Sequence, residues 1–122
     1  MDIKKAAATL AALAQPTRLA VFRRLIAAYP DGLAAGEIAR LCRVPHNTMS
    51  SHLASLARNG LVVSHKQSRA VIYRADLAGF RRLVRFLTRD CCNGRADICA
   101  PLLADLAAPC GGAEPAMEKV HD

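Results

Sequence analysis

Three cysteines within nine residues, Cys91, Cys92 and Cys99, form the strongest chemical signal of this 122-residue chain. Thiolates are soft ligands, and three of them in one short segment can bind a single thiophilic ion. Adjacent cysteines do not bond to each other without strain. The turn-forming pair Asn93-Gly94 would let Cys99 fold back toward the other two. The segment is therefore predicted to bind a ligand through three sulfurs.

The number of sulfur ligands restricts the choice of ion. Trivalent arsenic or antimony prefers a pyramid of three sulfurs, because a lone pair occupies the remaining position. Zinc takes four ligands, and the fourth would be Cys110 or His121. We therefore expect trivalent arsenic (arsenite) as the ligand, with antimonite as an alternative, zinc less favoured and Cys110 a candidate additional ligand. The fifth cysteine, Cys42, is predicted to be a small core residue.

A second set of polar residues lies on one face of a predicted helix. Met49, Leu53 and Leu56 recur at helical spacing and predict a helix that ends at about Arg58. Side chains near the N-terminal end of such a helix are suited to base edges and phosphates in a major groove. The face opposite the apolar residues carries short hydrogen-bonding side chains, which are His46, Asn47, Ser50, Ser51, His52 and Ser55.

The elements before this helix would hold it in place. Apolar spacing predicts three helices: one over about 3–13, one from Pro16 to the turn at 30–32, and one over about 35–42. A break at 43–45 separates the third helix from the next, which is the order of a helix-turn-helix. The residues of the second and third helices expected to face the core are Leu19, Phe22, Leu25, Ile26, Ile38 and Leu41.

After this helix the pattern changes period. Two β-branched runs, 61–65 and 70–74, predict a hairpin whose basic tip carries Lys66 and Arg69. Asp76 is suited to cap a last long helix. After Asp90 the sequence is expected to be irregular, with a short apolar segment near 101–106 and a flexible tail. The predicted fold class is mainly α with a small β-hairpin, α+β, as in a winged helix-turn-helix.

The charge is distributed unevenly along the chain. Fifteen basic and five acidic residues precede residue 91, whereas two basic and five acidic residues follow it, and the net charge is +7. A basic body with a mildly acidic tail suits a polyanion such as nucleic acid. Aromatic residues make up only 4%, and much of the apolar content is alanine. Such a core is thin, which favours a homodimer.

Other classes of protein are less compatible with the sequence. No stretch has the roughly 18 apolar residues of a membrane span, and the N-terminus is predicted to be a helix rather than a signal peptide. We therefore expect a cytoplasmic protein without membrane contact, whose cysteines are thiols. The sequence shows no pairing of a base with a nucleophile that would indicate an enzyme.

Three segments in order, LAALAQPTRLAVFRRLI, GLAAGEIARLCRVPHNTMSSHLASLARNGLV and SRAVIYRAD, resemble the ArsR/SmtB metalloregulators over about residues 8–90. The stretch 48–53 matches the recognition-helix core of that family, which adds Thr48 to the DNA-binding candidates. The resemblance implies a winged helix-turn-helix homodimer that binds double-stranded operator DNA and leaves it when an effector binds. Ser68 departs from the pattern, because many relatives have glycine at this point of the wing.

The resemblance also bears on the ligand site. The segment CCNGRADIC is similar to the C-terminal arsenite-binding segment of one ArsR subgroup, which favours Cys91, Cys92 and Cys99 as ligands. The family's better-known cysteine site in the third helix is absent, since the three positions hold Ala34, Gly36 and Ala39. No set of acids and histidines on the last helix indicates the zinc or cobalt site of other members.

The sequence thus predicts a DNA-binding and dimerisation domain over residues 1–90 and a C-terminal effector segment over residues 91–122. The expected function is an arsenite-responsive repressor that binds its operator as an apo homodimer. One rival is a repressor of the same fold switched by thiol oxidation, in which Cys91 or Cys92 pairs with Cys99 or Cys110. The other is a protein that sequesters metalloids without acting on DNA.

Overall fold

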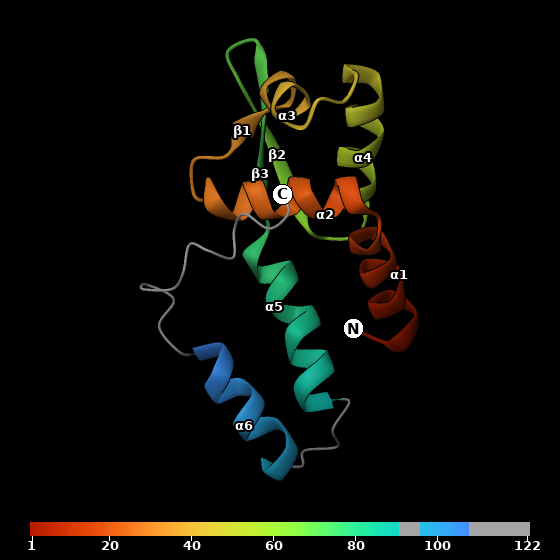
Figure 1. Ribbon diagram of the computed structural model, residues 1–122, viewed down its shortest axis with the longest axis vertical. Helices are drawn as coiled ribbons and strands as arrows, with labels where there is room; N and C mark the ends of the chain where they lie inside the picture. The colour runs from red at the N-terminus through yellow and green to blue at the C-terminus, as the bar shows by residue number, and fades with distance from the viewer. Residues whose placement is uncertain (91–95, 108–122) are drawn as a thin grey trace. The chain divides into compact units, whose positions relative to one another are not determined.

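The computed structural model describes residues 1–90 and 96–107. The chain divides into two compact units, Met1–Leu83 and Val84–Asp122. The first unit contains α1 (Ile3–Ala14), α2 (Pro16–Ala27), β1 (Leu33–Ala34), α3 (Ala35–Cys42), α4 (His46–Arg58), β2 (Val62–Gln67), β3 (Ala70–Ala75) and most of α5 (Leu77–Arg85) (Figure 1). This order of helices followed by a hairpin confirms the predicted winged helix-turn-helix.

Side chains and turns fix the ends of the first three helices. The Asp2 carboxylate accepts a hydrogen bond from the Lys5 backbone N–H at 2.8 Å, and the Gln15 side chain accepts one from the Arg18 N–H at 2.8 Å. Both satisfy donors that a helix N-terminus leaves open. At the end of α3, Arg43 has a φ of 56°, and the Val44 N–H donates to the Ala39 carbonyl at 3.0 Å. This C-terminal motif ends α3 and starts the turn to α4.

The three strands form an antiparallel sheet in the order β1-β3-β2. Val62 pairs with Ala75 and Gln67 with Ala70, so β2 and β3 form the predicted hairpin with a two-residue loop. Strand β1 was not predicted. It has only two residues, Leu33 and Ala34, and pairs with Tyr73 and Ile72. So short a strand has no periodicity to detect, and it forms because β3 offers an open edge.

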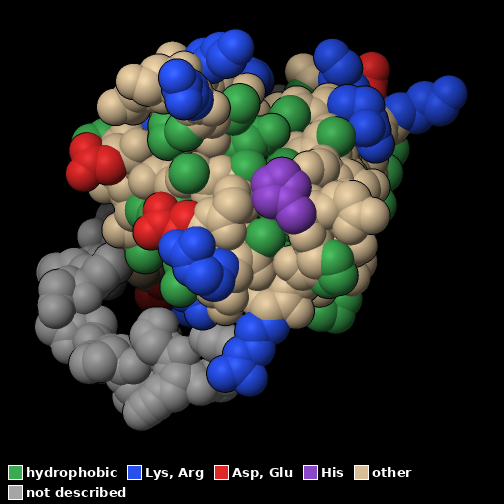
Figure 2. Space-filling view, turned by 90° about the horizontal axis from the view of Figure 1, so that it is seen from above, with side chains coloured by type: hydrophobic (Ala, Val, Ile, Leu, Met, Phe, Trp, Pro, Cys, Tyr) green, Lys and Arg blue, Asp and Glu red, His purple; other side chains and the backbone are tan. Residues whose placement is uncertain are grey.

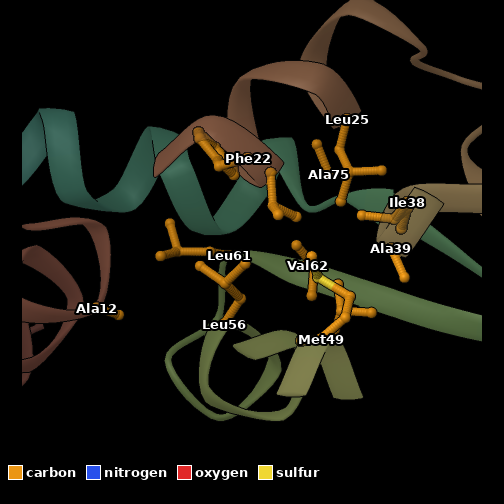
Figure 3. Packing of buried hydrophobic residues seen from close by; sticks show 12 residues of the cluster. Ala12, Phe22, Leu25, Ile38, Ala39, Met49, Leu56, Leu61, Val62 and Ala75 are labelled. Carbon is orange, nitrogen blue, oxygen red and sulfur yellow. The ribbon is translucent and has the colours of Figure 1, made fainter. Parts of the chain in front are cut away.

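The core lies between the helices and one face of the sheet (Figure 3). Met49, Leu53 and Leu56 are buried as predicted, and Cys42 packs at the edge of the core, also as predicted. The fully buried residues outside α4 include Val21, Leu25, Ile38 and Leu61. Because hydrophobic residues of α1, α2, α3, α4, β2 and β3 meet here, the position of α4 depends on the whole unit.

Three residues predicted to be in the core are instead exposed, namely Leu19, Ile26 and Leu41, at 43%, 39% and 43%. In α2 the inward face is centred on Val21 and Leu25, which places Leu19 and Ile26 at its edge. In α3 the inward face includes Ala39 next to Ile38. The spacing of apolar residues gives the period of a helix, but it does not fix which side of the stripe the rest of the protein covers.

Helix α5, which corresponds to the predicted last long helix, begins where the sequence indicates. The Asp76 carboxylate accepts a hydrogen bond from the Gly79 N–H at 3.0 Å, which confirms the predicted N-cap. After Arg85 the helix continues as a π-helical turn, η1 (Phe86–Asp90). Within the second unit, the Thr88 hydroxyl donates to the Val84 carbonyl at 2.8 Å. The predicted long helix is therefore α5 followed by η1.

The expectation of irregular structure after Asp90 is wrong for residues 96–107. These residues form α6 (Ala96–Ala107), with Pro101 inside the helix, and α6 lies against η1. A proline inside a helix removes one backbone donor and its ring crowds the carbonyl four residues earlier, so local sequence alone argues against a helix that nevertheless continues through Pro101. No helix within the described residues has the length and hydropathy needed to cross a lipid bilayer.

The backbone conformation of the hairpin loop leads us to expect that one substitution there stabilises the fold. Ser68, the first of its two residues, has a φ of 57°, a conformation that costs a residue with a Cβ roughly 1 kcal/mol. We expect Ser68→Gly to raise the free energy of unfolding by about 0.5–1 kcal/mol in urea denaturation. Gln67→Gly, at the end of β2, should instead lower it by a similar amount, because glycine loses more conformational freedom in a strand. A loss of stability in Ser68→Gly would contradict the explanation.

Candidate nucleic-acid interface

Helices α3 and α4, with the turn between them, form the helix-turn-helix. One face of α4 points away from the rest of the protein. The apolar side of α4 is anchored in the core through Met49, Leu53 and Leu56. Its first half therefore exposes polar side chains, and the exposed ones are His46, Asn47, Thr48, Ser50 and Ser51. All five belong to the predicted DNA-binding set. They provide hydrogen-bond donors and acceptors on the part of a recognition helix that meets base edges.

The N-terminus of α4 is also polar. Pro45 occupies the cap position without a side-chain hydrogen bond to the helix. The Asn47 Oδ1 atom accepts a hydrogen bond from the Thr48 N–H at 3.0 Å, which holds the Asn47 side chain against the first turn. Backbone N–H groups at a helix start attract anions such as phosphate. Reading of bases and binding of phosphate can therefore occur on the same turn.

Two members of the predicted set are less accessible. His52 and Ser55 are half-buried, in contrast to the exposed residues nearer the start of α4. The His52 Nδ1 atom lies 3.4 Å from the Arg18 Nη1 atom of α2. The Ser55 carbonyl accepts a hydrogen bond from the Asn59 side chain at 2.8 Å. The second half of α4 thus turns these two positions partly toward the protein.

The hairpin of β2 and β3, which is the wing of this fold, adds positive charge at the same end of the first unit. Lys66 lies in β2 opposite Val71, and Arg69 lies in the loop; both side chains are exposed. In Figure 1 the tip of the hairpin and the start of α4 lie at the same end of the first unit. Figure 2, which views that end from above, shows Lys and Arg side chains around the margin and a histidine near the middle. Such an arrangement suits a groove bordered by phosphates.

Sequence reasoning did not identify the role of Arg18. Its partner His52 is 34 positions away, and no local pattern indicates a contact over that separation. A second residue without a predicted role is the exposed Arg43, whose left-handed backbone starts the turn before α4. The sequence could have indicated Arg43 by its position, because it lies in the break between the two helices, directly before Val44 and Pro45.

The predicted ligand site falls outside the described side chains. Cys91, Cys92 and Cys110 lie outside the described residues, and so does the side chain of Cys99, whose backbone belongs to α6. Within the part of the chain that the structure describes, no three His, Cys, Asp or Glu side chains gather as a metal ion would require. The three-sulfur site therefore stays a prediction from the sequence.

Comparison with known proteins identifies relatives of the same fold. A family model described as a helix-turn-helix domain matches residues 13–65, from the end of α1 into β2. The transcriptional activator HlyU of Vibrio cholerae is 30% identical over 89 residues, which cover 73% of this chain and 80% of HlyU. The structure of reduced HlyU from Vibrio cholerae has a TM-score of 0.56 at 27% identity, covering 68% of this chain and 85% of that one.

Two further solved structures cover the same fold. An ArsR-like transcriptional regulator from Rhodococcus sp. RHA1 is 29% identical with a TM-score of 0.60, and the match covers 92% of this chain and 95% of that one. The homodimeric winged helix-turn-helix DNA-binding domain of Mb0332 from Mycobacterium bovis is 25% identical with a TM-score of 0.58, covering 67% and 74%. The chain therefore belongs to the ArsR family of winged helix-turn-helix transcriptional regulators.

Proposed function

We propose that this regulator is an arsenite-responsive repressor, which binds operator DNA in the cytoplasm as an apo homodimer and releases it when arsenite binds three thiolates. The observation that carries the DNA-binding part is the exposed polar first half of α4, at the same end of the first unit as the basic hairpin tip. The ligand part rests on Cys91, Cys92 and Cys99 in the sequence. Antimonite has the same coordination preference and is the alternative inducer.

The exposed apolar residues of α1 support the homodimer. Ile3 is 74% and Leu10 42% exposed, whereas the inward face of this helix consists of the small residues Ala6, Thr9 and Ala12. Large apolar side chains on one helix face favour burial against a partner. Two-fold pairing through this face would place two copies of α4 about one turn of DNA apart, on a pseudo-palindromic operator. Mb0332, one of the structural neighbours, is a homodimer.

The proposed switch is a coupling between two sites. Arsenite lowers the affinity for DNA, and by thermodynamic linkage DNA lowers the affinity for arsenite by the same factor. Coupling free energies of about 1–3 kcal/mol are typical and correspond to roughly a five- to 150-fold change in affinity. The operator complex should therefore need a higher arsenite concentration than the free protein for half-saturation.

Fluorescence anisotropy tests this function on the reduced protein and a duplex from its own upstream region. Arsenite is expected to release the wild type, whereas Cys91→Ser, Cys92→Ser and Cys99→Ser should each require more arsenite or fail to release. Cys42→Ser is the matched control, because Cys42 packs at the core, and this variant should release like the wild type. Unchanged release in all three cluster variants would contradict the site.

A thiol-redox switch is the second candidate. It is favoured by the likeness to HlyU, whose solved structure is described as the reduced form. Oxidation would join Cys91 or Cys92 to Cys99 or Cys110, with peroxide as the oxidant accepting the two electrons. Release of DNA by peroxide, together with no release by arsenite under reducing conditions, would favour this candidate over the first.

Reading of bases by α4 has its own test. Asn47→Ala is expected to reduce the preference for the operator over a scrambled duplex by roughly five- to 100-fold, which is the value of one bidentate base contact. Affinity for the scrambled duplex should change little. Asn59→Ala is the matched control at the other end of α4; it removes a cap on the Ser55 carbonyl and should lower stability without altering the preference. Equal losses on both duplexes would contradict base reading by Asn47.

A further inference from the structure

We propose that Arg18 is a positioning residue for DNA recognition, because it fixes the rotation of α4 from the α1–α2 junction without contacting DNA itself. The inference rests on the proposed binding of operator DNA by α4. It concerns a residue that lies outside the recognition helix and the wing. The contacts of its guanidinium group with two other helices carry the argument.

The first contact ties Arg18 to α1. The Arg18 Nε atom donates to the Ala12 carbonyl at 2.8 Å. In a continuous helix this carbonyl would accept from the backbone N–H four residues later, but that residue is Pro16, which has no N–H. Arg18 supplies the missing donor at the end of α1. The backbone N–H of Arg18 donates to the Gln15 side chain at 2.8 Å, so the backbone of this arginine is held in place as well.

The second contact reaches the recognition helix. The Arg18 Nη1 atom lies 3.4 Å from the His52 Nδ1 atom. A guanidinium group can only donate, so a hydrogen bond between the two requires Nδ1 to accept through its lone pair. Both side chains are half-buried, which limits competition from water. One guanidinium thus links α1, α2 and α4.

A further polar contact holds the other end of α4. The Thr9 hydroxyl lies 3.3 Å from the Asn59 carbonyl and also donates to the Lys5 carbonyl at 3.0 Å. Thr9 is buried. Helix α4 is therefore connected to the first two helices at its middle and at its C-terminal end, whereas its first half projects toward the candidate interface.

Apolar packing alone leaves the rotation of a helix less well defined than a directional polar contact does. A helix with side chains has a radius of about 5–6 Å, so turning it by roughly 20° moves a side-chain end by about 2 Å. Hydrogen bonds to base edges tolerate only a few tenths of an ångström. The contact between Arg18 and His52 is thus placed to align Asn47 and Ser50 with the bases.

Two single variants and their double variant test the inference. Arg18→Gln and His52→Leu should each lower operator affinity roughly tenfold, as expected for loss of a hydrogen bond to a charged group. The double variant should be little worse than either single one, because both remove the same contact. His52→Asn keeps an acceptor near the position of Nδ1 and should restore most of the affinity. If Arg18→Gln does not fold, Arg18→Lys takes its place, with a smaller loss expected.

Salt dependence separates positioning from direct contact. Arg18→Gln should leave the slope of log affinity against log salt unchanged, whereas loss of a phosphate contact lowers it by about 0.9. Arg24→Gln, an exposed arginine on the same helix, removes the same charge and should change affinity less than twofold. A reduced slope, additive losses, or lower stability with unchanged operator affinity would each overturn the inference. Absence of operator binding by the wild type would instead refute the proposed function.

Discussion

Replacing Gly79 by alanine should lower the free energy of unfolding by about 3 kcal/mol, at the upper end of the usual cost of overpacking. Gly79 is buried in α5, and a Cβ atom there would overlap the carbonyl oxygen of Gly60. That obstacle is backbone and cannot rotate away. Gly60 itself has a φ of 74° and lies between the end of α4 and β2, so relief would require shifting α5 or the end of the recognition helix.

Gly36→Ala is the matched control for this substitution. Gly36 is exposed in α3, and a Cβ there would meet nothing within 4 Å. Alanine is the better helix former, so this variant should gain up to about 1 kcal/mol. Urea denaturation at equal protein concentration measures both changes. A Gly79→Ala variant as stable as the wild type would show that α5 does not pack against Gly60 as described.

The second large effect concerns the wing. Reversing both charges at its tip, Lys66→Glu with Arg69→Glu, should lower operator affinity several hundredfold at 0.15 M salt. Each phosphate contact contributes about a fivefold factor at this ionic strength, and the double reversal changes the charge by four units. The slope of log affinity against log salt should fall by roughly 3 to 4. Fluorescence anisotropy over a range of salt concentrations gives both quantities.

The matched control makes the same change of charge elsewhere. Lys4 and Lys5 are exposed on α1, at the end of the first unit away from the hairpin tip (Figure 1). Charges beyond the Debye length of about 8 Å are largely screened, so Lys4→Glu with Lys5→Glu should lower affinity less than threefold. Similar losses in the two double variants would mean that the wing contributes only to the general field of the protein.

The parts of this fold that local signals determine could be predicted from the sequence. Helix α3 ends at Cys42 as expected, because the break at 43–45 contains a residue in the left-handed region and a proline. The Asp76 cap and the hairpin follow from equally local patterns. The outward face of α4 was also predictable, since burial of Met49, Leu53 and Leu56 leaves only one side for the polar residues.

What the sequence could not provide depends on contacts between distant segments. Strand β1 exists because β3 accepts it, and Leu41 is exposed because α3 turns Ala39 toward the core instead. The link from Arg18 to His52 joins two helices that are adjacent only in the folded chain. Helix α6 was not predicted, and it continues through Pro101, although a proline inside a helix lacks one donor and crowds the carbonyl four residues before it.

The most direct test of the account is the affinity of the reduced wild-type protein for a duplex from its own upstream region and for a scrambled duplex of equal length. We expect at least a thousandfold tighter binding to the upstream duplex at physiological salt, as specific regulators show, and a roughly five- to 150-fold loss of operator affinity when arsenite is added. Equal affinity for both duplexes at every salt concentration would contradict DNA reading by α4 and would favour a protein that only sequesters the metalloid.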